Sequence, residues 1–497
     1  MSRSTPASPN AANDAPVLLA FLAVAAALLA AFAWDGSLLA SDDAIYAQAA
    51  REILADGRFP DVTWQGLPLF EKGPVLFWAL AGAQAALGPT MLALRLPGLL
   101  AGLGLLAALF VLARRLGLSR DAALAACGLL LATSLFYFNA RRPMTDVPGA
   151  ALGLAGFVAL AFPGGRWRPV WGGVALGLAA LTKLVAPVPF VLALGLLQFA
   201  PAFRRPRALA VGLAVAAAVA LPWHVAMIAL HGAAFVDVYF GYHLAARATR
   251  VLVGGGAAAA YADWVFDREW PTLAFVLAGL AAAVAAAVRR RPDGLAALAL
   301  LAGAVLPLAA ASTGVAHYLV PALPGVALGV GVLVDRVGMR RPRIVAAVAG
   351  ALLAAAFVAA NGRDLLRPDH GAGTRDACAA LARAGLADDV AGTWNLHDPA
   401  VTWYCGTPGR LYADNEGVLA ATRDIPMLKA WVVAAGDADL RALAAVGAVV
   451  ITRPEPLPEL LARAAAAGVR PEVVANARSR IAVRLSARPP AAPAAVP

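Results

Sequence analysis

Charged side chains stand at the ends of apolar runs in this sequence, where a charge is costly and therefore suggests a role. The clearest case is Asp42-Asp43, which directly follows the apolar run 17–40. Because aspartate also caps helices, the pair alone leaves a helix boundary and a catalytic carboxylate equally open. The other candidates lie in similar settings: Glu71, Lys72, Arg142, Asp146, Lys183, His243, Arg247, His317 and Tyr318.

Several of these candidates also have a plain structural interpretation. Glu71 and Lys72 can form an exposed ion pair, which contributes little to stability. His243 can be an interfacial or core histidine. His317-Tyr318 can belong to an aromatic belt at a span end.

Lys183 is a lone lysine between two apolar runs, and a lysine costs roughly 2.5–3.5 kcal/mol at mid-bilayer. The expected topology places Lys183 at an outer turn, and the functional interpretation is favoured there too. The whole set combines carboxylates that can accept a proton with cations that can hold a phosphate. Group transfer from a phosphorylated lipid needs this combination. The sequence contains no Walker loop, dinucleotide glycine pattern, zinc-ligand spacing or nucleophile elbow, so we expect neither a metal nor a cofactor.

The composition is that of a polytopic membrane protein. Of 497 residues, 61% are hydrophobic and only 14% are charged, with a mean hydropathy of +0.72. The net charge of +11 comes from arginines clustered in short loops between apolar runs. This pattern indicates the positive-inside rule rather than a nucleic-acid partner.

The apolar runs predict an all-α membrane domain with about eleven spans and a cytoplasmic N-terminus. The expected spans are 17–40, 93–113, 121–138, 147–162, 169–182, 184–200, 208–230, 271–288, 294–312, 319–334 and 344–361. The run 74–88 is short and follows a polar loop, so we expect an interfacial helix there. The candidate residues then face the non-cytoplasmic side, in the outer loop 41–92, the long loop 231–270 and shorter turns.

The chain is expected to divide into four parts. They are a disordered cytoplasmic N-terminus (1–16), a transmembrane catalytic domain (17–361), a small α/β domain outside the membrane (362–485) and a disordered Pro/Ala tail (486–497). Three cysteines are too few for a disulfide framework, and whether Cys378 and Cys405 pair is left open.

The stretch from "SDDAIYAQAAREILADG" through "LPLFEKGPVLFW" to "RLPGLLAGL" resembles the first outer loop of a known superfamily. These are the GT-C membrane glycosyltransferases of the dolichyl-phosphate-mannose protein mannosyltransferase and bacterial aminoarabinose (lipid A) transferase group. The resemblance covers roughly residues 17–335 and is specific over 41–100. Here Asp43 replaces the usual Glu, and Gly73 replaces the first Pro of the family's "EKPP".

The resemblance implies an inverting glycosyltransferase at the periplasmic face of a bacterial inner membrane. Asp42 would be the catalytic carboxylate and Asp146 a second acid that organises the site. The donor is expected to be a polyprenyl-phosphate sugar and the acceptor a lipid, such as lipid A, a glycan or a protein. Membrane lipids are the other expected partners, and a monomer is expected.

The residues expected to hold the donor's phosphate or sugar are Asp43, Glu71, Lys72, Arg142, Lys183, His243, Arg247, His317 and Tyr318. The competing hypothesis is a transporter or flippase of polyprenyl-linked sugars. That hypothesis predicts polar residues deep inside spans and repeat symmetry, and the sequence shows neither.

Overall fold

The computed structural model describes residues 11–39, 42–251, 257–337, 369–407, 409–423 and 425–487. Its contacts divide the chain into two compact units. The helical unit consists of Met1–Trp34, Phe59–Asp61 and Phe70–Arg367. The α/β unit consists of Asp35–Arg58, Val62–Leu69 and Pro368–Pro497.

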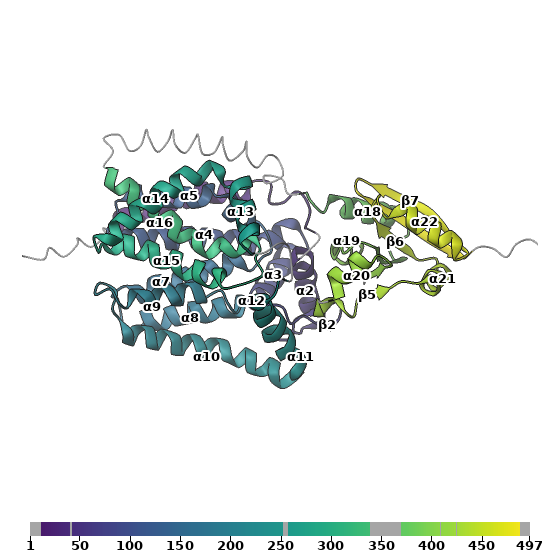
Figure 1. The fold of residues 1–497 in the computed structure, drawn as a ribbon, viewed down its shortest axis with the longest axis horizontal. Helices are drawn as coiled ribbons and strands as arrows, with labels where there is room; N and C mark the ends of the chain where they lie inside the picture. The colour runs from purple at the N-terminus through teal and green to yellow at the C-terminus, as the bar shows by residue number, and fades with distance from the viewer. Residues whose placement is uncertain are drawn as a thin grey trace, which may run out of the picture. The chain divides into compact units, whose positions relative to one another are not determined.

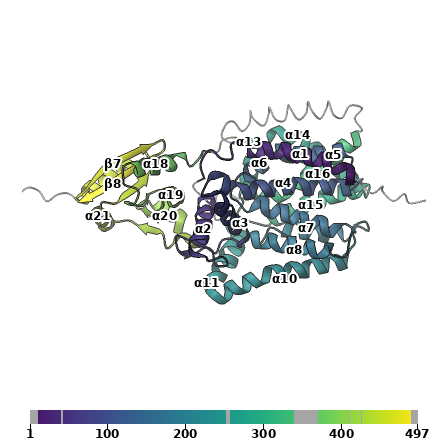
Figure 2. The ribbon, with the colours of Figure 1, turned by 180° about the vertical axis from the view of Figure 1, so that it is seen from behind.

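The helical unit is built almost entirely of helices (Figure 1). They are α1 (Ala11–Ala30), α3 (Val75–Leu87), α4 (Met91–Arg115), α5 (Arg120–Ala132), α6 (Ser134–Asn139), α7 (Asp146–Ala161), α8 (Arg168–Thr182), α9 (Val188–Leu197), α10 (Pro206–His231), α11 (Ala233–Phe235), the π-helix η1 (Val236–Ala246), α12 (Arg247–Thr249), α13 (Ala257–Arg268), α14 (Trp270–Val288), α15 (Pro292–Ala309), the 3₁₀-helix η2 (Ala316–Ala322) and α16 (Leu323–Val337). Helix α10 runs along α8 (Figure 1), and α1 lies beside α4 (Figure 2).

The expected spans from 93–113 to 319–334 each coincide with one helix or with two consecutive helices. Five helices in the described part of the chain are long and apolar enough to cross a membrane, as judged by length and composition. The all-helical membrane architecture is therefore confirmed, whereas the count of eleven stays a prediction. The expected span 344–361 lies outside the described residues, and α3 occupies the run for which an interfacial helix was expected.

One expectation about the helical unit is wrong. Residues 11–16 were expected to be disordered, but α1 begins at Ala11. Its Asp14 forms ion pairs with Arg114 and Arg120, at 2.8 and 3.3 Å, which hold this first turn against the ends of α4 and α5. The stretch 231–270, which was expected to connect two spans outside the membrane, is largely helical in its described residues and includes η1.

Glycines let the helices around the candidate residues approach closely. A Cβ atom on Gly149 of α7 would lie 2.7 Å from the Cβ of Ala186, and one on Gly153 would lie 2.2 Å from the Phe190 ring. Small residues at a spacing of four are a common way for membrane helices to pack backbone against backbone. This contact fixes the start of α7, with Asp146, beside the turn between α8 and α9 that carries Lys183.

The α/β unit contains a six-stranded sheet in the order β5-β4-β3-β6-β8-β7. Strands β3 to β6 are parallel, while β8 runs antiparallel to β6 and to β7. The strands are β3 (Val390–Trp394), β4 (Arg410–Ala413), β5 (Val432–Ala434), β6 (Val449–Thr452), β7 (Val469–Ala477) and β8 (Arg480–Ala487). The helices between and before them are α18 (Ala372–Arg383), α19 (Ala400–Cys405), α20 (Glu416–Arg423), the 3₁₀-helix η3 (Pro426–Leu428), α21 (Asp437–Ala445) and α22 (Leu457–Ala466).

Both faces of the central strand β6 are buried, which explains its continuous apolar run. Along β6, side chains alternate between faces, so Val449 and Ile451 join the core under α18 and α19 while Val450 joins the core under α21 and α22. A disulfide joins Cys378 of α18 to Cys405 of α19. The predicted α/β domain is thus confirmed, and the pairing that the sequence left open is settled.

The α/β unit also includes part of the first loop, which the sequence analysis placed in the membrane domain. This part is α2 (Asp42–Asp56) and a hairpin of β1 (Thr63–Trp64) and β2 (Leu67–Pro68). The physical reason is a set of specific contacts, such as the Arg51 guanidinium lying 3.7 Å from the centre of the Trp403 ring. The expected boundary at 361/362 therefore does not describe the whole α/β unit, which also contains Asp35–Arg58 and Val62–Leu69.

Candidate active site

A cavity of about 370 Å³ lies in the helical unit, and most of the predicted site residues line it. They come from five segments that are far apart in the sequence: the residues before α3, the start of α7, the end of α8, η1 with α12, and η2. The predicted residues in its lining are Glu71, Lys72, Asp146, Lys183, His243, Arg247 and Tyr318. Seven residues predicted from the sequence thus lie together in one site.

Asp146 and Lys183 form the central ion pair. The Lys183 ammonium donates to Asp146 Oδ1 at 2.8 Å, and the two side chains are 16% and 4% exposed. The other carboxylate oxygen, Oδ2, lies 4.0 Å from His317 Nε2. Burial alone would lower the pKa of Lys183, but the nearby Asp146 carboxylate raises it above its usual value. Lys183 is therefore a stable cation in this site.

Arg247 is held by the segment that precedes α16. Its Nη1 donates to the Tyr318 hydroxyl at 2.7 Å, and its carbonyl oxygen accepts a hydrogen bond from the Thr313 amide. Although burial opposes it, the Tyr318 oxygen and the Glu71 carboxylate raise the pKa of Arg247 above its usual value. The Lys183 ammonium lies 4.3 Å from the centre of the Tyr318 ring, so one tyrosine contacts two of the cations.

Gly73 explains how Glu71 and Lys72 reach this site. A Cβ atom at Gly73 would lie 2.0 Å from the Leu181 carbonyl oxygen, so only a glycine allows the chain to pass against the end of α8. Leu181 is two residues before Lys183. Gly73, which replaces the first Pro of the family's "EKPP" pattern, is thus needed here because the two backbones are in close contact. Lys72 and Glu71 form an ion pair of 3.6 Å and are both nearly buried.

His243 lies among the cations without a hydrogen bond. Both of its ring nitrogens are buried and have no hydrogen-bond partner among the described residues. Burial, and then the positive charges of Lys72, Arg247 and Lys183, hold the pKa of His243 well below its usual value. The imidazole is therefore neutral at pH 7, and it can donate a hydrogen bond to a bound group or accept one from it.

The charges of the cavity do not cancel. Three cations (Lys72, Lys183 and Arg247) face two carboxylates (Glu71 and Asp146), so the lining carries one excess positive charge when His243 is neutral. Most of the remaining wall is apolar and includes Leu184, Val188, Leu244, Pro307 and Leu308. A buried positive charge beside an apolar wall suits a ligand that joins an anionic group to a hydrocarbon chain.

Four predicted residues lie elsewhere. Asp42 and Asp43 begin α2 in the α/β unit, where Asp43 is buried. Arg142 stacks on the Phe138 ring, at 4.7 Å from its centre. His317 reaches the site through Asp146, as described above.

Tyr239 and Thr313 also line the cavity, although neither was among the residues predicted from the sequence. The Tyr239 hydroxyl is buried and has no hydrogen-bond partner in the described part of the chain. Its signal was present in "FVDVYFGYHL", where Tyr239 precedes His243 by four residues, about one helical turn. The described residues contain no group of three or more His, Cys, Asp and Glu that could hold a metal ion. That the protein works without a metal or cofactor stays a prediction.

Residues 71–226 match the family model for dolichyl-phosphate-mannose-protein mannosyltransferase. No curated protein matches the chain. Among solved structures, the fold is similar to that of ArnT from Cupriavidus metallidurans bound to undecaprenyl phosphate, with a TM-score of 0.74 and 19% identity over 94% of this chain and 98% of that one. The apo form of the same protein gives a TM-score of 0.73, also at 19% identity, over 95% and 98%. The resemblance of the sequence to this superfamily is confirmed.

Proposed function

We propose that this protein is a membrane glycosyltransferase that moves a sugar from a polyprenyl-phosphate donor to an acceptor. The observation that carries the proposal is the excess positive charge of a cavity whose remaining wall is mostly apolar. A polyprenyl phosphate offers the matching anion and hydrocarbon. Support comes from the family model over 71–226 and from the fold of ArnT, one of whose structures has undecaprenyl phosphate bound.

The donor's phosphate would be held by Lys72, Lys183 and Arg247. When the acceptor oxygen attacks the anomeric carbon, the bond from that carbon to the phosphate oxygen breaks and its electron pair stays on the phosphate. The phosphate gains negative charge in this step, so fixed cations stabilise the transition state more than the ground state. A phosphate is already a good leaving group and needs these cations rather than a proton donor.

Asp42 is proposed as the carboxylate that takes the acceptor's proton, because it occupies the position of the catalytic aspartate in the superfamily pattern. A single displacement of this kind inverts the configuration of the anomeric carbon. Asp146 would orient Lys183 toward the phosphate. The acceptor is proposed to be a lipid such as lipid A, a glycan or a protein, at the periplasmic face of a bacterial inner membrane.

The direct test is incubation of the purified protein with polyprenyl-phosphate sugars and an extract of envelope lipids. The expected result is release of free polyprenyl phosphate and transfer of the sugar. Lys72→Ala should lower the transfer rate at saturating donor, and Gln84→Ala on α3 serves as a matched control outside the cavity. Binding of the donor without release of polyprenyl phosphate in any acceptor mixture would refute the proposal and favour a transporter.

A further inference from the structure

We propose that the α/β unit positions the catalytic carboxylate through contacts with the chain on both sides of Asp42. This inference rests on the proposed function of Asp42. It assigns positioning roles to Trp403, Tyr404 and Gly371, none of which lies in the cavity. We call these three residues, with the Cys378–Cys405 disulfide, the α2 clamp.

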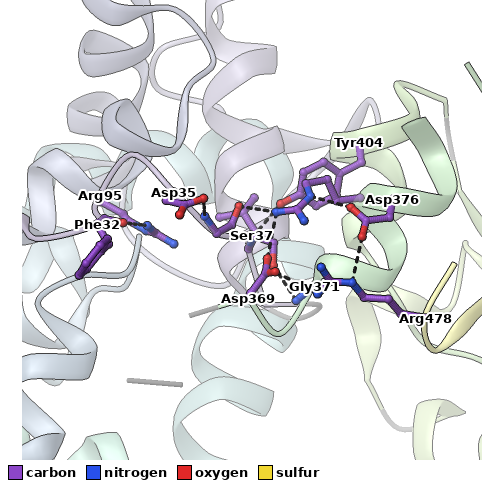
Figure 3. Close-up of polar contacts among 12 residues, drawn as sticks. Phe32, Asp35, Ser37, Arg95, Asp369, Gly371, Asp376, Tyr404 and Arg478 are labelled. Atoms are coloured by element: carbon purple, nitrogen blue, oxygen red, sulfur yellow. Dashed lines mark hydrogen bonds and ion pairs between the residues drawn. The ribbon is translucent and has the colours of Figure 1, made fainter. Parts of the chain in front are cut away.

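The clamp holds the chain just before Asp42. The Leu38 amide donates to the Tyr404 hydroxyl at 2.8 Å, and the Gly371 amide donates to the Ser37 hydroxyl at 2.9 Å (Figure 3). A Cβ atom at Gly371 would lie 2.0 Å from the Leu38 carbonyl oxygen, so the two backbones are in direct contact. The position of the chain four residues before Asp42 is therefore set by residues from the C-terminal region.

The clamp also holds the helix after Asp42. The Arg51 guanidinium stacks on the Trp403 ring at 3.7 Å and its Nη1 donates to the Trp403 carbonyl oxygen at 3.3 Å. Trp403 and Tyr404 are neighbours on α19, so one short helix binds both the entrance to α2 and its middle. A stacked, hydrogen-bonded guanidinium fixes direction as well as distance. Helix α2 can then neither slide nor rotate freely.

The disulfide ties together the two helices that form the clamp. Cys405 is the last residue of α19 and directly follows Tyr404, while Cys378 lies on α18, whose preceding residue is Gly371. The start of α18 is braced further by Arg375 and Arg478, each of which forms ion pairs with both Asp369 and Asp376 at 2.9–3.1 Å (Figure 3). Single exposed ion pairs are weak, but a connected network of this kind restrains a chain end more effectively.

The charge of Asp42 also affects His397, in the loop that follows β3. Burial lowers the pKa of His397, in the loop after β3, while the carboxylates of Asp398 and Asp42 oppose this effect. Asp42 is therefore within electrostatic reach of the carboxyl end of β3. In parallel sheets of this kind, functional groups gather at that end of the strands.

The test compares two clamp variants, Tyr404→Phe and Trp403→Leu, with Tyr412→Phe on β4 as a matched control in the same unit. A displacement of about 1 Å at a catalytic group can cost about 10²-fold in rate, so we expect kcat to fall about ten-fold or more in the clamp variants. The KM for the donor should stay unchanged, because the cavity belongs to the helical unit. The control should keep the wild-type kcat.

Hydrogen exchange supplies a readout that does not depend on activity. Amides of 42–56 should exchange faster in Tyr404→Phe and Cys405→Ser than in the wild type, and at the wild-type rate in Tyr412→Phe. Wild-type kcat in both clamp variants, or an equal loss in the control, would overturn the proposal. If the wild type itself releases no polyprenyl phosphate, the proposed function fails, and unchanged exchange in 42–56 would then overturn the clamp separately.

Discussion

The buried pair of Asp146 and Lys183 can be tested by removing each partner and then both. At 2.8 Å and an effective dielectric constant of about 20, their attraction is about 6 kcal/mol, and the cost of desolvating two ions offsets most of it. Removing one partner leaves the other charge buried and uncompensated, which costs about 3–5 kcal/mol. Lys183→Met and Asp146→Asn should therefore each be clearly destabilising.

The double variant Lys183→Met/Asp146→Asn should regain most of this stability, because neither buried charge remains. Its transfer rate should stay low, since Lys183 is proposed to hold the donor's phosphate. Stability and activity then separate: the single variants lose both, and the double variant loses only activity. The assays are unfolding in detergent for the first quantity and transfer at saturating donor for the second.

Two results would refute this reasoning. Recovery of activity in the double variant would mean that the pair is purely structural and that the phosphate is held elsewhere. Additive loss of stability in the double variant would mean that the two side chains are not energetically coupled, despite their distance.

Asp42→Asn should lower transfer by about 10²–10⁴-fold with normal donor binding, whereas Asp43→Asn should be milder; equal rates in both would contradict the assignment. Arg247→Lys should lower the rate at saturating donor, because a point charge cannot reproduce the guanidinium's contact with Tyr318 and a phosphate together; a wild-type rate would argue against that role. Acidification below pH 6.5 should destabilise the wild type more than His243→Gln in thermal unfolding. The pKa of His243 is lowered in the folded state, so the folded imidazole stays neutral while that of the unfolded chain takes up a proton. The stabilising contribution of His243 therefore exists above pH 6.5 and is lost as the pH falls. Gly73→Ala should reduce both stability and transfer, because its Cβ would meet the Leu181 carbonyl; Gly82→Ala on α3, where a Cβ meets nothing within 4 Å, is the control and should be neutral or stabilising.

The membrane helices could be predicted because hydrocarbon demands long apolar runs and the loops between them carry arginine. The candidate cavity residues could be found for the same reason: Lys183 and Asp146 stand out against an apolar background. Tyr239 could not be singled out, because only the fold shows that its hydroxyl is buried in the lining of the cavity. The role of Gly73 was equally hidden, because a glycine shows its purpose only when the opposing carbonyl of Leu181 is known.

The division into two units depends on contacts that no local pattern reveals. Arg51 reads as an ordinary polar residue of an amphipathic helix, yet its partner is Trp403, more than 350 positions away. Cation–π and backbone contacts of this kind depend on tertiary structure alone. The sequence therefore predicted a C-terminal α/β domain correctly but separated it from the part of the first loop that packs with it.

The first loop alternates between the two units. After α2, the short segment 59–61 returns to the helical unit, where Trp78 and Trp223 donate to its carbonyl oxygens and His231 lies 2.9 Å from Asp61. The chain then enters the α/β unit again for the hairpin and leaves it at Phe70, beside Glu71. Asp42 therefore belongs to the α/β unit, whereas Lys72, Lys183 and Arg247 belong to the helical unit, and no local pattern in the first loop shows where the chain passes from one unit to the other.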